Sequence, residues 1–221
     1  MFLFAQRAFT KMNTQIPREH FLMGRGRHRQ NKFEQVDDGI YRCSRPSRAL
    51  LGFASEIHRR NIAYVAPGDW RKTSVPFKDF ENAASDICEI MRAVDPDVVI
   101  PTEADFEEHR AFAEVNMAVG VVGETTFSEF SVHRDNDNGF NVATLIIYLV
   151  CTAEGGGLNL YDPMGHGGPI KTIAARNDRG GPVAVAMRGD VPHCPAPIVG
   201  AGVRIAVVFQ FPVRRGEARA S

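Results

Sequence analysis

Hydrophobic residues recur with a helical period in the first half of the chain and with strand-like spacing in the second half. Residues 47–60 and 77–94 place apolar side chains three or four positions apart, which predicts two amphipathic helices. A third helix is expected from residue 102 or 103 to about residue 115, with Thr102 as its cap. From about residue 116 onward, short apolar runs alternate with Gly, Asn, Asp and Pro, which is typical of strands and turns.

The apolar runs of the second half predict seven or so strands: residues 117–122, 125–132, 142–150, 158–161, 170–174, 182–186 and 204–213. Short strands at this spacing are typical of a sandwich or barrel rather than of βαβ units. We therefore expect an α+β fold in which the helices pack against the outside of one sheet. The expected organisation is a basic irregular segment (1–45), a helical support region (46–115), a β-core (116–213) and a flexible tail (214–221).

Composition places the chain among ordinary globular proteins. Its 221 residues are 44% hydrophobic, which is enough for one domain with a buried core. The longest apolar run, residues 143–151, is far too short to cross a bilayer, so we expect a soluble protein. The four cysteines form no C-x-x-C pair, which favours reduced thiols in an intracellular compartment, either nuclear or cytoplasmic.

The formal net charge is zero, but the charges are distributed unevenly. Residues 1–80 contain 15 Lys and Arg against 7 Asp and Glu. A basic N-terminal third is typical of a surface that faces a polyanion such as nucleic acid, and equally of a solvated surface. Residues 1–30 fit either a mitochondrial-type targeting segment or a basic arm, and the sequence leaves both interpretations open.

His133, Asp135 and His193 are the residues that carry the most chemical information. His133 and Asp135 are two positions apart, so at the end of a strand both side chains project to the same side. Two imidazoles and one carboxylate form the facial triad that holds Fe(II) with three positions open. A hairpin centred near Val199 is expected to bring Arg204 beside His193, where its guanidinium would bind a carboxylate.

Two alternatives to this metal site have to be weighed. His166 is a second candidate for the third ligand, but it lies in a glycine-rich loop with no Arg in register. The same three ligands also suit Zn(II), so a zinc hydrolase is an alternative to an iron enzyme. A zinc hydrolase gives no role to Arg204, which favours the iron interpretation.

Three segments carry a family resemblance: HRD at 133–135, GGGLNLYD at 155–162 and HCPAPIVGAGVR at 193–204. Together they resemble the Fe(II)/2-oxoglutarate dioxygenases. The resemblance implies a double-stranded β-helix, or jelly roll, with iron on the His-x-Asp pair and the distal His, and 2-oxoglutarate on Arg204. It also implies hydroxylation of a C–H bond by O2, with release of succinate and CO2. Gly156 and Leu158 are expected to be structural.

The segment HRDNDNG at 133–139 looks most like that of the TET/JBP-type methylpyrimidine dioxygenases. This likeness implies the methyl group of a 5-methylpyrimidine in nucleic acid as the oxidised group, with Asn138 on the flipped base. Phe127 is the aromatic residue expected to stack on that base, ahead of Phe130 and Phe140. Asn138 is equally typical of an ordinary turn, and each Phe of core packing. The alternatives are a prolyl-hydroxylase-like enzyme acting on a protein or peptide, and a non-enzymatic jelly-roll binding module.

Overall fold

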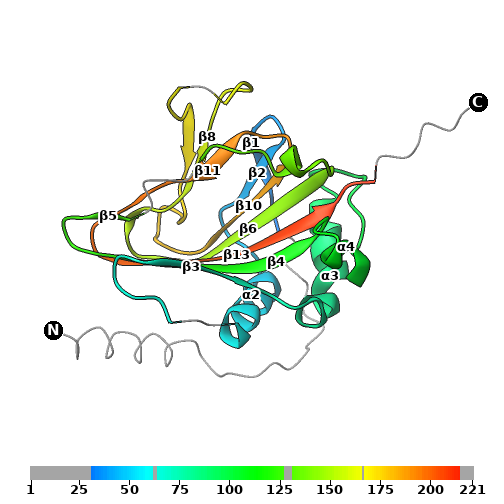
Figure 1. Cartoon of the computed structure of the whole chain (residues 1–221), viewed down its shortest axis with the longest axis horizontal. Coiled ribbons are helices and arrows are strands. Elements are labelled where there is room, and N and C mark those ends of the chain that lie inside the picture. The colour runs from blue at the N-terminus through cyan, green and yellow to red at the C-terminus, as the bar shows by residue number, and fades with distance from the viewer. Residues whose placement is uncertain (1–30, 62–63, 127–130, 166, 215–221) are drawn as a thin grey trace, which may run out of the picture.

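The fold is built around one seven-stranded antiparallel sheet, here called the main sheet (Figure 1). The computed structural model describes residues 31–61, 64–126, 131–165 and 167–214. In the order of the sheet, its strands are β1 (Glu34–Asp37), β2 (Ile40–Cys43), β10 (Val183–Arg188), β6 (Val142–Cys151), β13 (Gly202–Pro212), β4 (Phe112–Gly120) and β3 (Trp70–Ser74). The long central strands β6 and β13 pair along almost their whole length, so they form the rigid middle of the molecule.

Two three-stranded sheets lie on one side of the main sheet, where Figure 1 draws β8 and β11 above it. Their strands, in sheet order, are β11 (His193–Pro195), β8 (Leu158–Leu160) and β9 (Lys171–Ile173), and then β5 (Thr125–Thr126), β12 (Ile198–Val199) and β7 (Glu154–Gly155). A buried apolar cluster that includes Ile146, Leu158 and Val185 packs between the layers. This two-layer arrangement matches the expected jelly roll.

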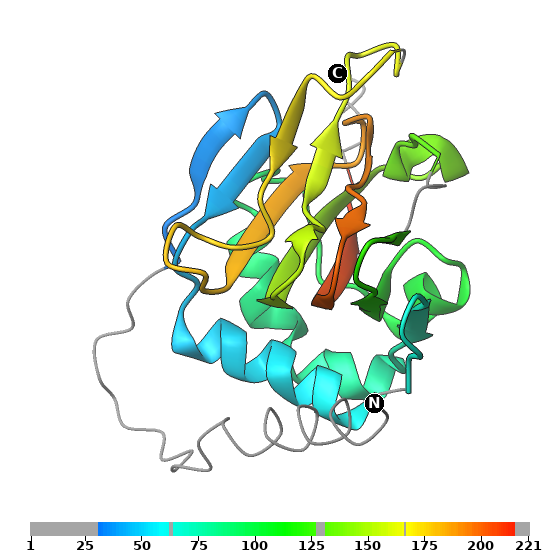
Figure 2. The same cartoon turned by 90° about the vertical axis from the view of Figure 1, so that its left-hand side faces the viewer.

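Helices cover the opposite side of the main sheet (Figure 2). They are α2 (Arg48–Arg60), α3 (Phe77–Met91) and α4 (Glu103–Glu107). The second apolar cluster joins α2 and α3 to the sheet through residues such as Ala54, Ile57 and Phe209. The expectation that helices pack against the outside of one sheet is therefore confirmed. No helix within the described residues is long and apolar enough to span a membrane.

Phe80 is a central contact between α3 and the main sheet. Its side chain is fully buried, and its ring lies 5.5 Å from that of Phe209 and 5.6 Å from that of Phe211, centroid to centroid. Phe80→Ala should lower the free energy of unfolding by about 3–5 kcal/mol, because it leaves a cavity in a packed interior. Urea unfolding measures this, and Val122→Ala, at an 80% exposed position, should change the value by less than about 0.5 kcal/mol.

Alternation along the central strands separates the two apolar clusters. On β6, Leu145 and Ile147 face the helices, whereas Thr144, Ile146 and Tyr148 face the small sheets. We call the side of the main sheet that faces the small sheets its inner face. On β13, residues 204, 206, 208 and 210 lie on this inner face. The polar residues of the inner face are the ones that define the site described below.

The sequence pattern placed the start of the sheet too late. We expected a basic irregular segment up to residue 45 and a helical region up to residue 115, but β1 to β4 all belong to the main sheet. Strands β1 and β3 carry mostly exposed residues at the edges of the sheet, so they lack the apolar signal that a central strand shows.

The third helix is also shorter than expected. It ends at Glu107, and residues 112–115 lie in β4 instead. Thr102 caps it as expected, in a capping box with Asp105. The chain then turns at His109, which has a φ of 58°. Strand β4 pairs on both of its edges, with β3 and β13, and this pairing overrides the weak helical pattern.

Candidate metal centre

His133, Asp135 and His193 converge on one point between the layers. Their candidate ligand atoms all lie within 4.8 Å of one another. The Nε2 atoms of both histidines lie 3.8 Å from Oδ1 of Asp135. Two imidazole nitrogens and a carboxylate oxygen on one side of a point are the donor set for a six-coordinate divalent metal with open positions. The structure therefore brings the three residues predicted from the sequence together, and their binding of a metal stays a prediction.

The backbone locks the two histidines together. His133 and His193 form an isolated antiparallel bridge, in which each amide donates to the other residue's carbonyl, at 3.0 and 2.9 Å. Two ligands that are sixty residues apart are thus fixed by direct hydrogen bonds rather than by a continuous strand. The side chain of Arg134, between the first two ligands, points away and donates to the carbonyl of Pro163.

Hydrogen bonds also set which imidazole nitrogen faces the metal position. Nδ1 of His133 lies 3.1 Å from the carbonyl of Ser131, and Nδ1 of His193 lies 2.9 Å from the carbonyl of Val191. A carbonyl only accepts, so Nδ1 of each ring carries the proton. Nε2 of each ring is then left with its lone pair directed at the cluster, as a metal ligand requires.

Asp135 is held by a residue of the main sheet. The Thr144 hydroxyl donates to its Oδ2 at 2.5 Å, which leaves Oδ1 to face the two imidazoles. Asp135 begins a short 3-10 helix, η1 (Asp135–Asn138). Asn136 anchors that helix, because its amide donates to the carbonyl of Gly189 and its side chain accepts from Val142. A Cβ at position 189 would lie 2.1 Å from Oδ1 of Asn136, so glycine is required there.

The protonation state of His193 suits a metal ligand. Burial lowers the pKa of His193 below its usual value; Asp135 offsets part of this effect and His133 adds to it. A lowered pKa keeps the imidazole neutral near pH 7, which is the form that binds metals. The His133 side chain is 44% exposed, whereas that of His193 is 6% exposed, so the metal position opens toward solvent on the His133 side.

Thr144→Val tests the support of the carboxylate. The change keeps the shape of the side chain and removes the hydroxyl that fixes Asp135, so we expect Fe(II) affinity to fall by roughly 10- to 100-fold. Anaerobic metal titration of the purified protein measures this affinity. Thr172→Val, which removes a hydroxyl bonded to Asn159 on the small sheet, is the matched control and should leave it unchanged.

Arg204 lies on β13, on the inner face of the main sheet that also carries Thr144, and is 5% exposed. Its Nε donates to the carbonyl of Gly156 at 2.7 Å, and its guanidinium lies 5.1 Å from the centre of the Tyr148 ring. Burial raises the pKa of Tyr148, and Arg204 offsets part of that shift. The Tyr148 hydroxyl is buried and has no hydrogen-bond partner among the described residues. A cation beside an unpaired hydroxyl can hold a carboxylate.

The glycines beside Arg204 allow two segments to approach closely. A Cβ at Gly155 would lie 2.1 Å from the carbonyl oxygen of Pro197, and one at Gly157 would lie 2.1 Å from that of Ile173. Gly156 has a φ of 68° and packs against the Arg204 side chain. The glycine-rich segment is structural, as the sequence predicted.

One part of the predicted site geometry is wrong. Arg204 and His193 do not lie side by side on a hairpin, because β11 pairs with β8 in a small sheet while β13 belongs to the main sheet. The intervening residues pair with the glycine-rich segment instead, through bonds from Ala196 to Gly157 and from Gly156 to Pro197. The two residues therefore reach the interior from different layers.

Four other predicted residues lie wholly or partly outside the described residues. His166 and Phe127 lie outside the described residues, as does Phe130. Asn138 ends η1 and precedes Gly139, which has a φ of 87°, so its backbone forms the expected turn. Its side chain lies outside the described part of the structure, and its contact with a substrate stays a prediction.

Thr144 and Tyr148 were missed at the level of sequence. The available signal was a hydroxyl at two positions of one face within an otherwise apolar strand. Polar groups on the inner face of a buried strand need partners there, so such a pattern indicates a site.

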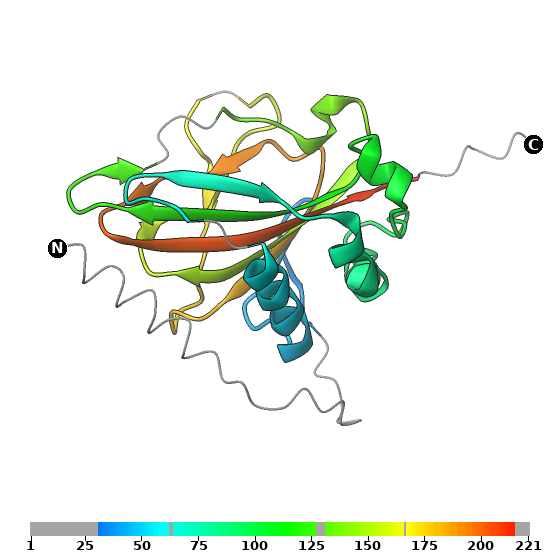
Figure 3. The ribbon, with the colours of Figure 1, turned by 60° about the horizontal axis from the view of Figure 1, so that its bottom comes forward.

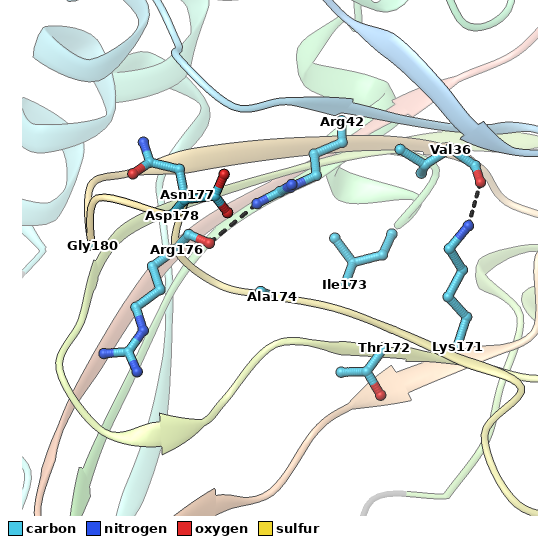
Figure 4. Close-up of a pocket in the computed structure, with 10 residues that line it drawn as sticks. All are labelled: Val36, Arg42, Lys171, Thr172, Ile173, Ala174, Arg176, Asn177, Asp178 and Gly180. Atoms are coloured by element: carbon cyan, nitrogen blue, oxygen red, sulfur yellow. Dashed lines mark hydrogen bonds between the residues drawn. The ribbon is translucent and has the colours of Figure 1, made fainter.

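A cavity of about 600 Å³ lies away from this cluster, between β2 and the segment around β9 (Figure 4). None of the three candidate ligands lines it. Arg42 donates across it to the carbonyl of Arg176 at 3.1 Å, and Lys171 donates to the carbonyl of Val36. The candidate metal centre is therefore identified by the donor set of His133, Asp135 and His193 and not by the size of a cavity.

No protein-family model and no curated protein matches the chain. A solved prolyl hydroxylase from Trichoplax adhaerens, in complex with a hypoxia inducible factor oxygen degradation domain peptide fragment, is similar in structure. It is 12% identical with a TM-score of 0.50, and the match covers 83% of this chain and 88% of that one. The chain therefore shares the fold of this prolyl hydroxylase. The expected double-stranded β-helix is therefore confirmed.

Two further solved structures are similar with lower scores. A 2OG-Fe(II) oxygenase family oxidoreductase from Burkholderia pseudomallei is 13% identical, with a TM-score of 0.42 and coverage of 86% of this chain and 77% of that one. A prolyl-4-hydroxylase from Pseudomonas putida is 16% identical, with a TM-score of 0.45 and coverage of 81% and 94%.

Proposed function

We propose that the chain is an Fe(II)/2-oxoglutarate-dependent dioxygenase that hydroxylates a C–H bond. The observation that carries this proposal is the convergence of His133, Asp135 and His193 within 4.8 Å on the inner side of an oxygenase fold. Both imidazoles present Nε2, and the carboxylate presents one oxygen, so the donor set fits Fe(II).

Two buried polar groups on the inner face of the main sheet, Arg204 and Tyr148, offer a binding site for 2-oxoglutarate. Arg204 would hold the far carboxylate, and the unpaired Tyr148 hydroxyl would donate a second hydrogen bond to it. The bond from Arg204 to Gly156 fixes the guanidinium before the ligand arrives. A zinc hydrolase with the same triad would give no function to the buried Arg204 guanidinium and Tyr148 hydroxyl.

The protein's own part in the reaction is to position and to exclude water. Fe(II) and 2-oxoglutarate, when bound, supply the oxidising chemistry with O2, and the 2-oxo acid is released as succinate and CO2. Thr144 holds the ligand carboxylate in one orientation, and the Ser131 and Val191 carbonyls hold the imidazoles. The apolar cluster below the site keeps water from the reacting groups.

The decisive experiment combines binding and turnover. The full chain is mixed anaerobically with Fe(II) and 2-oxoglutarate, and the metal-to-ligand charge-transfer band is recorded. Air is then admitted, and succinate is measured without an added substrate. A band and slow succinate release support the proposal. Absence of both, with the fold intact, would support a non-enzymatic jelly-roll module, and Zn(II)-dependent hydrolysis would support the zinc alternative.

For the substrate, we propose the methyl group of a 5-methylpyrimidine in nucleic acid. The support is the HRDNDNG segment at 133–139 and the excess of basic residues in the N-terminal third. The alternative substrate is a protein or peptide, as in a prolyl-hydroxylase-like enzyme, and the structural likeness to a prolyl hydroxylase supports this alternative about as well. Mass spectrometry of nucleosides from methylated DNA, run beside a proline-containing peptide library, distinguishes the two. Oxidised methylpyrimidines support the first, and hydroxylated peptides support the second.

A further inference from the structure

A strip of polar side chains lies beside the triad on the inner face of the main sheet. Gln210 of β13 is paired directly with Thr144, the residue that holds Asp135. Directly paired residues point to the same face of a sheet, so Gln210 lies next to the support of the metal position. One strand further, Glu114 and Asn116 of β4 face the same side, as their paired partners on β13 show. Figure 3 shows β13, β4 and β3 running side by side.

Two of these side chains are buried with an unused hydrogen-bonding atom. Gln210 is 2% exposed and Asn116 is 6% exposed. Nε2 of Gln210 and Oδ1 of Asn116 have no partner among the residues that the structure describes. A buried polar atom without a partner is unfavourable, so a ligand that supplies the partner explains why both amides stand on this face.

The strip carries no net charge. Oε1 of Glu114 accepts a hydrogen bond from the Asn116 amide at 2.8 Å and lies 3.4 Å from Nζ of Lys72. The ion pair balances the carboxylate, which leaves an amide donor at Gln210 and an amide acceptor at Asn116. An uncharged ligand with both N–H and C=O groups fits this pattern better than a phosphate or a carboxylate.

Two residues of the strip lie away from the groups proposed for 2-oxoglutarate. Those groups, Tyr148 and Arg204, lie on β6 and β13. Glu114 and Asn116 lie on β4, on the other side of β13 from β6. Bound 2-oxoglutarate would therefore leave these two residues free for the second substrate.

We propose that Gln210, Asn116 and Glu114 form the subsite for the primary substrate, and that it binds the polar edge of a pyrimidine base. The inference rests on the proposed oxygenase function and names its substrate class. A pyrimidine presents ring N–H or amino donors beside carbonyl acceptors, and its 5-methyl group lies on the same ring. Gln210 would hold the base next to the metal position, and Asn116 and Glu114 would orient the part of the substrate that lies further out.

A prolyl ring fits this face less well. A pyrrolidine ring has no N–H within a peptide and offers only apolar surface, so the ring itself would supply no partner for the Gln210 and Asn116 amides, and only the flanking peptide groups could pair with them. A site built to form hydrogen bonds rejects ligands that cannot form them, because its own polar groups are then left without partners. Gln210 and Asn116 are therefore specificity-determining residues on this proposal.

Direct binding tests the subsite without relying on turnover. The full chain, with and without Fe(II) and 2-oxoglutarate under anaerobic conditions, is titrated with a short single-stranded DNA that contains one thymine. The comparison ligand carries 2,4-difluorotoluene in its place, which keeps the shape and the methyl group but forms hydrogen bonds poorly. We expect roughly 10- to 100-fold tighter binding of the thymine strand. Free thymidine, in a parallel arm, distinguishes a nucleoside from a strand as the source of the base.

Gln210→Met removes the amide and keeps a side chain of similar size. It should reduce the preference for the thymine strand over the difluorotoluene strand to less than about threefold. Gln35→Met, on the exposed edge strand β1, is the matched control and should keep it. Thermal unfolding confirms that each variant is folded. If Gln210→Met does not fold, the wild-type preference for thymine still decides.

Equal binding of both strands, or tighter binding of a proline- or amide-containing peptide, would overturn the subsite assignment. That failure is distinguishable from failure of the oxygenase proposal, which would show as a missing charge-transfer band and missing succinate release in the wild-type protein.

Discussion

His193→Ala is expected to abolish 2-oxoglutarate turnover and to remove tight Fe(II) binding. His193 is the most buried of the three candidate ligands, and Nε2 of its ring points at Asp135. Without it, one imidazole and one carboxylate remain, and two donors hold a divalent metal poorly compared with three. We expect a loss of at least about 1,000-fold in succinate formation, since the reaction has no metal-free route. Anaerobic Fe(II) titration and succinate release measure the two effects separately.

The change at the first histidine should give the same result. His133→Ala removes a ligand that is 44% exposed, so its effect on folding should be small while its effect on metal binding should be large. His58→Ala, on helix α2 at the opposite side of the main sheet, is the matched control and should keep Fe(II) affinity. Normal turnover in either ligand variant would show that the metal is held elsewhere.

Much of this site was predictable because its chemistry is local in sequence. The His-x-Asp spacing places His133 and Asp135 on one side of a short extended segment, whatever the rest of the fold does. The glycine-rich segment predicted a close approach of another backbone segment, and the structure shows this at Gly155 and Gly157. Central strands such as β6 carry long apolar runs, so they were found with nearly correct bounds.

The features that were missed depend on partners far apart in the chain. Strands β1 and β3 are short, largely exposed and held by a single neighbour each, so little in their composition marks them as strands. The expected hairpin between His193 and Arg204 failed because the glycine-rich segment competes for the same backbone groups. A pattern along one segment does not say which of two possible partners will pair with it.

The polar residues of the inner face illustrate the same limit. Thr144, Tyr148 and Gln210 each sit in a strand that is otherwise apolar, and only the register of β6 against β13 shows that they share a face. Asn116 joins them through the pairing of β4 with β13. The residues proposed to bind the co-substrate and those of the proposed substrate strip can thus be grouped only once the order of the strands is known.

Arg204→Ala is expected to weaken 2-oxoglutarate binding on the order of 100-fold while leaving Fe(II) affinity largely intact. The buried guanidinium supplies charge-assisted hydrogen bonds to the far carboxylate, and each such bond contributes about 1.5–3 kcal/mol. Arg204→Lys should recover only part of the affinity, because an ammonium lacks the planar pair of donors. The apparent Kd from the charge-transfer band and the KM for 2-oxoglutarate measure the effect.

A shortened co-substrate separates this role from a structural one. A 2-oxo acid that lacks the far carboxylate should bind the wild-type protein weakly and the Arg204→Ala variant about equally weakly, because neither complex contains the ion pair. If Arg204 only supported the fold, both 2-oxo acids would lose affinity by the same factor. Arg188→Ala is the matched control, since Arg188 pairs with Asp38 at 3.0 Å and Asp190 at 3.2 Å instead. Weakened 2-oxoglutarate binding in that variant, with Arg204→Ala unaffected, would transfer the carboxylate site to Arg188.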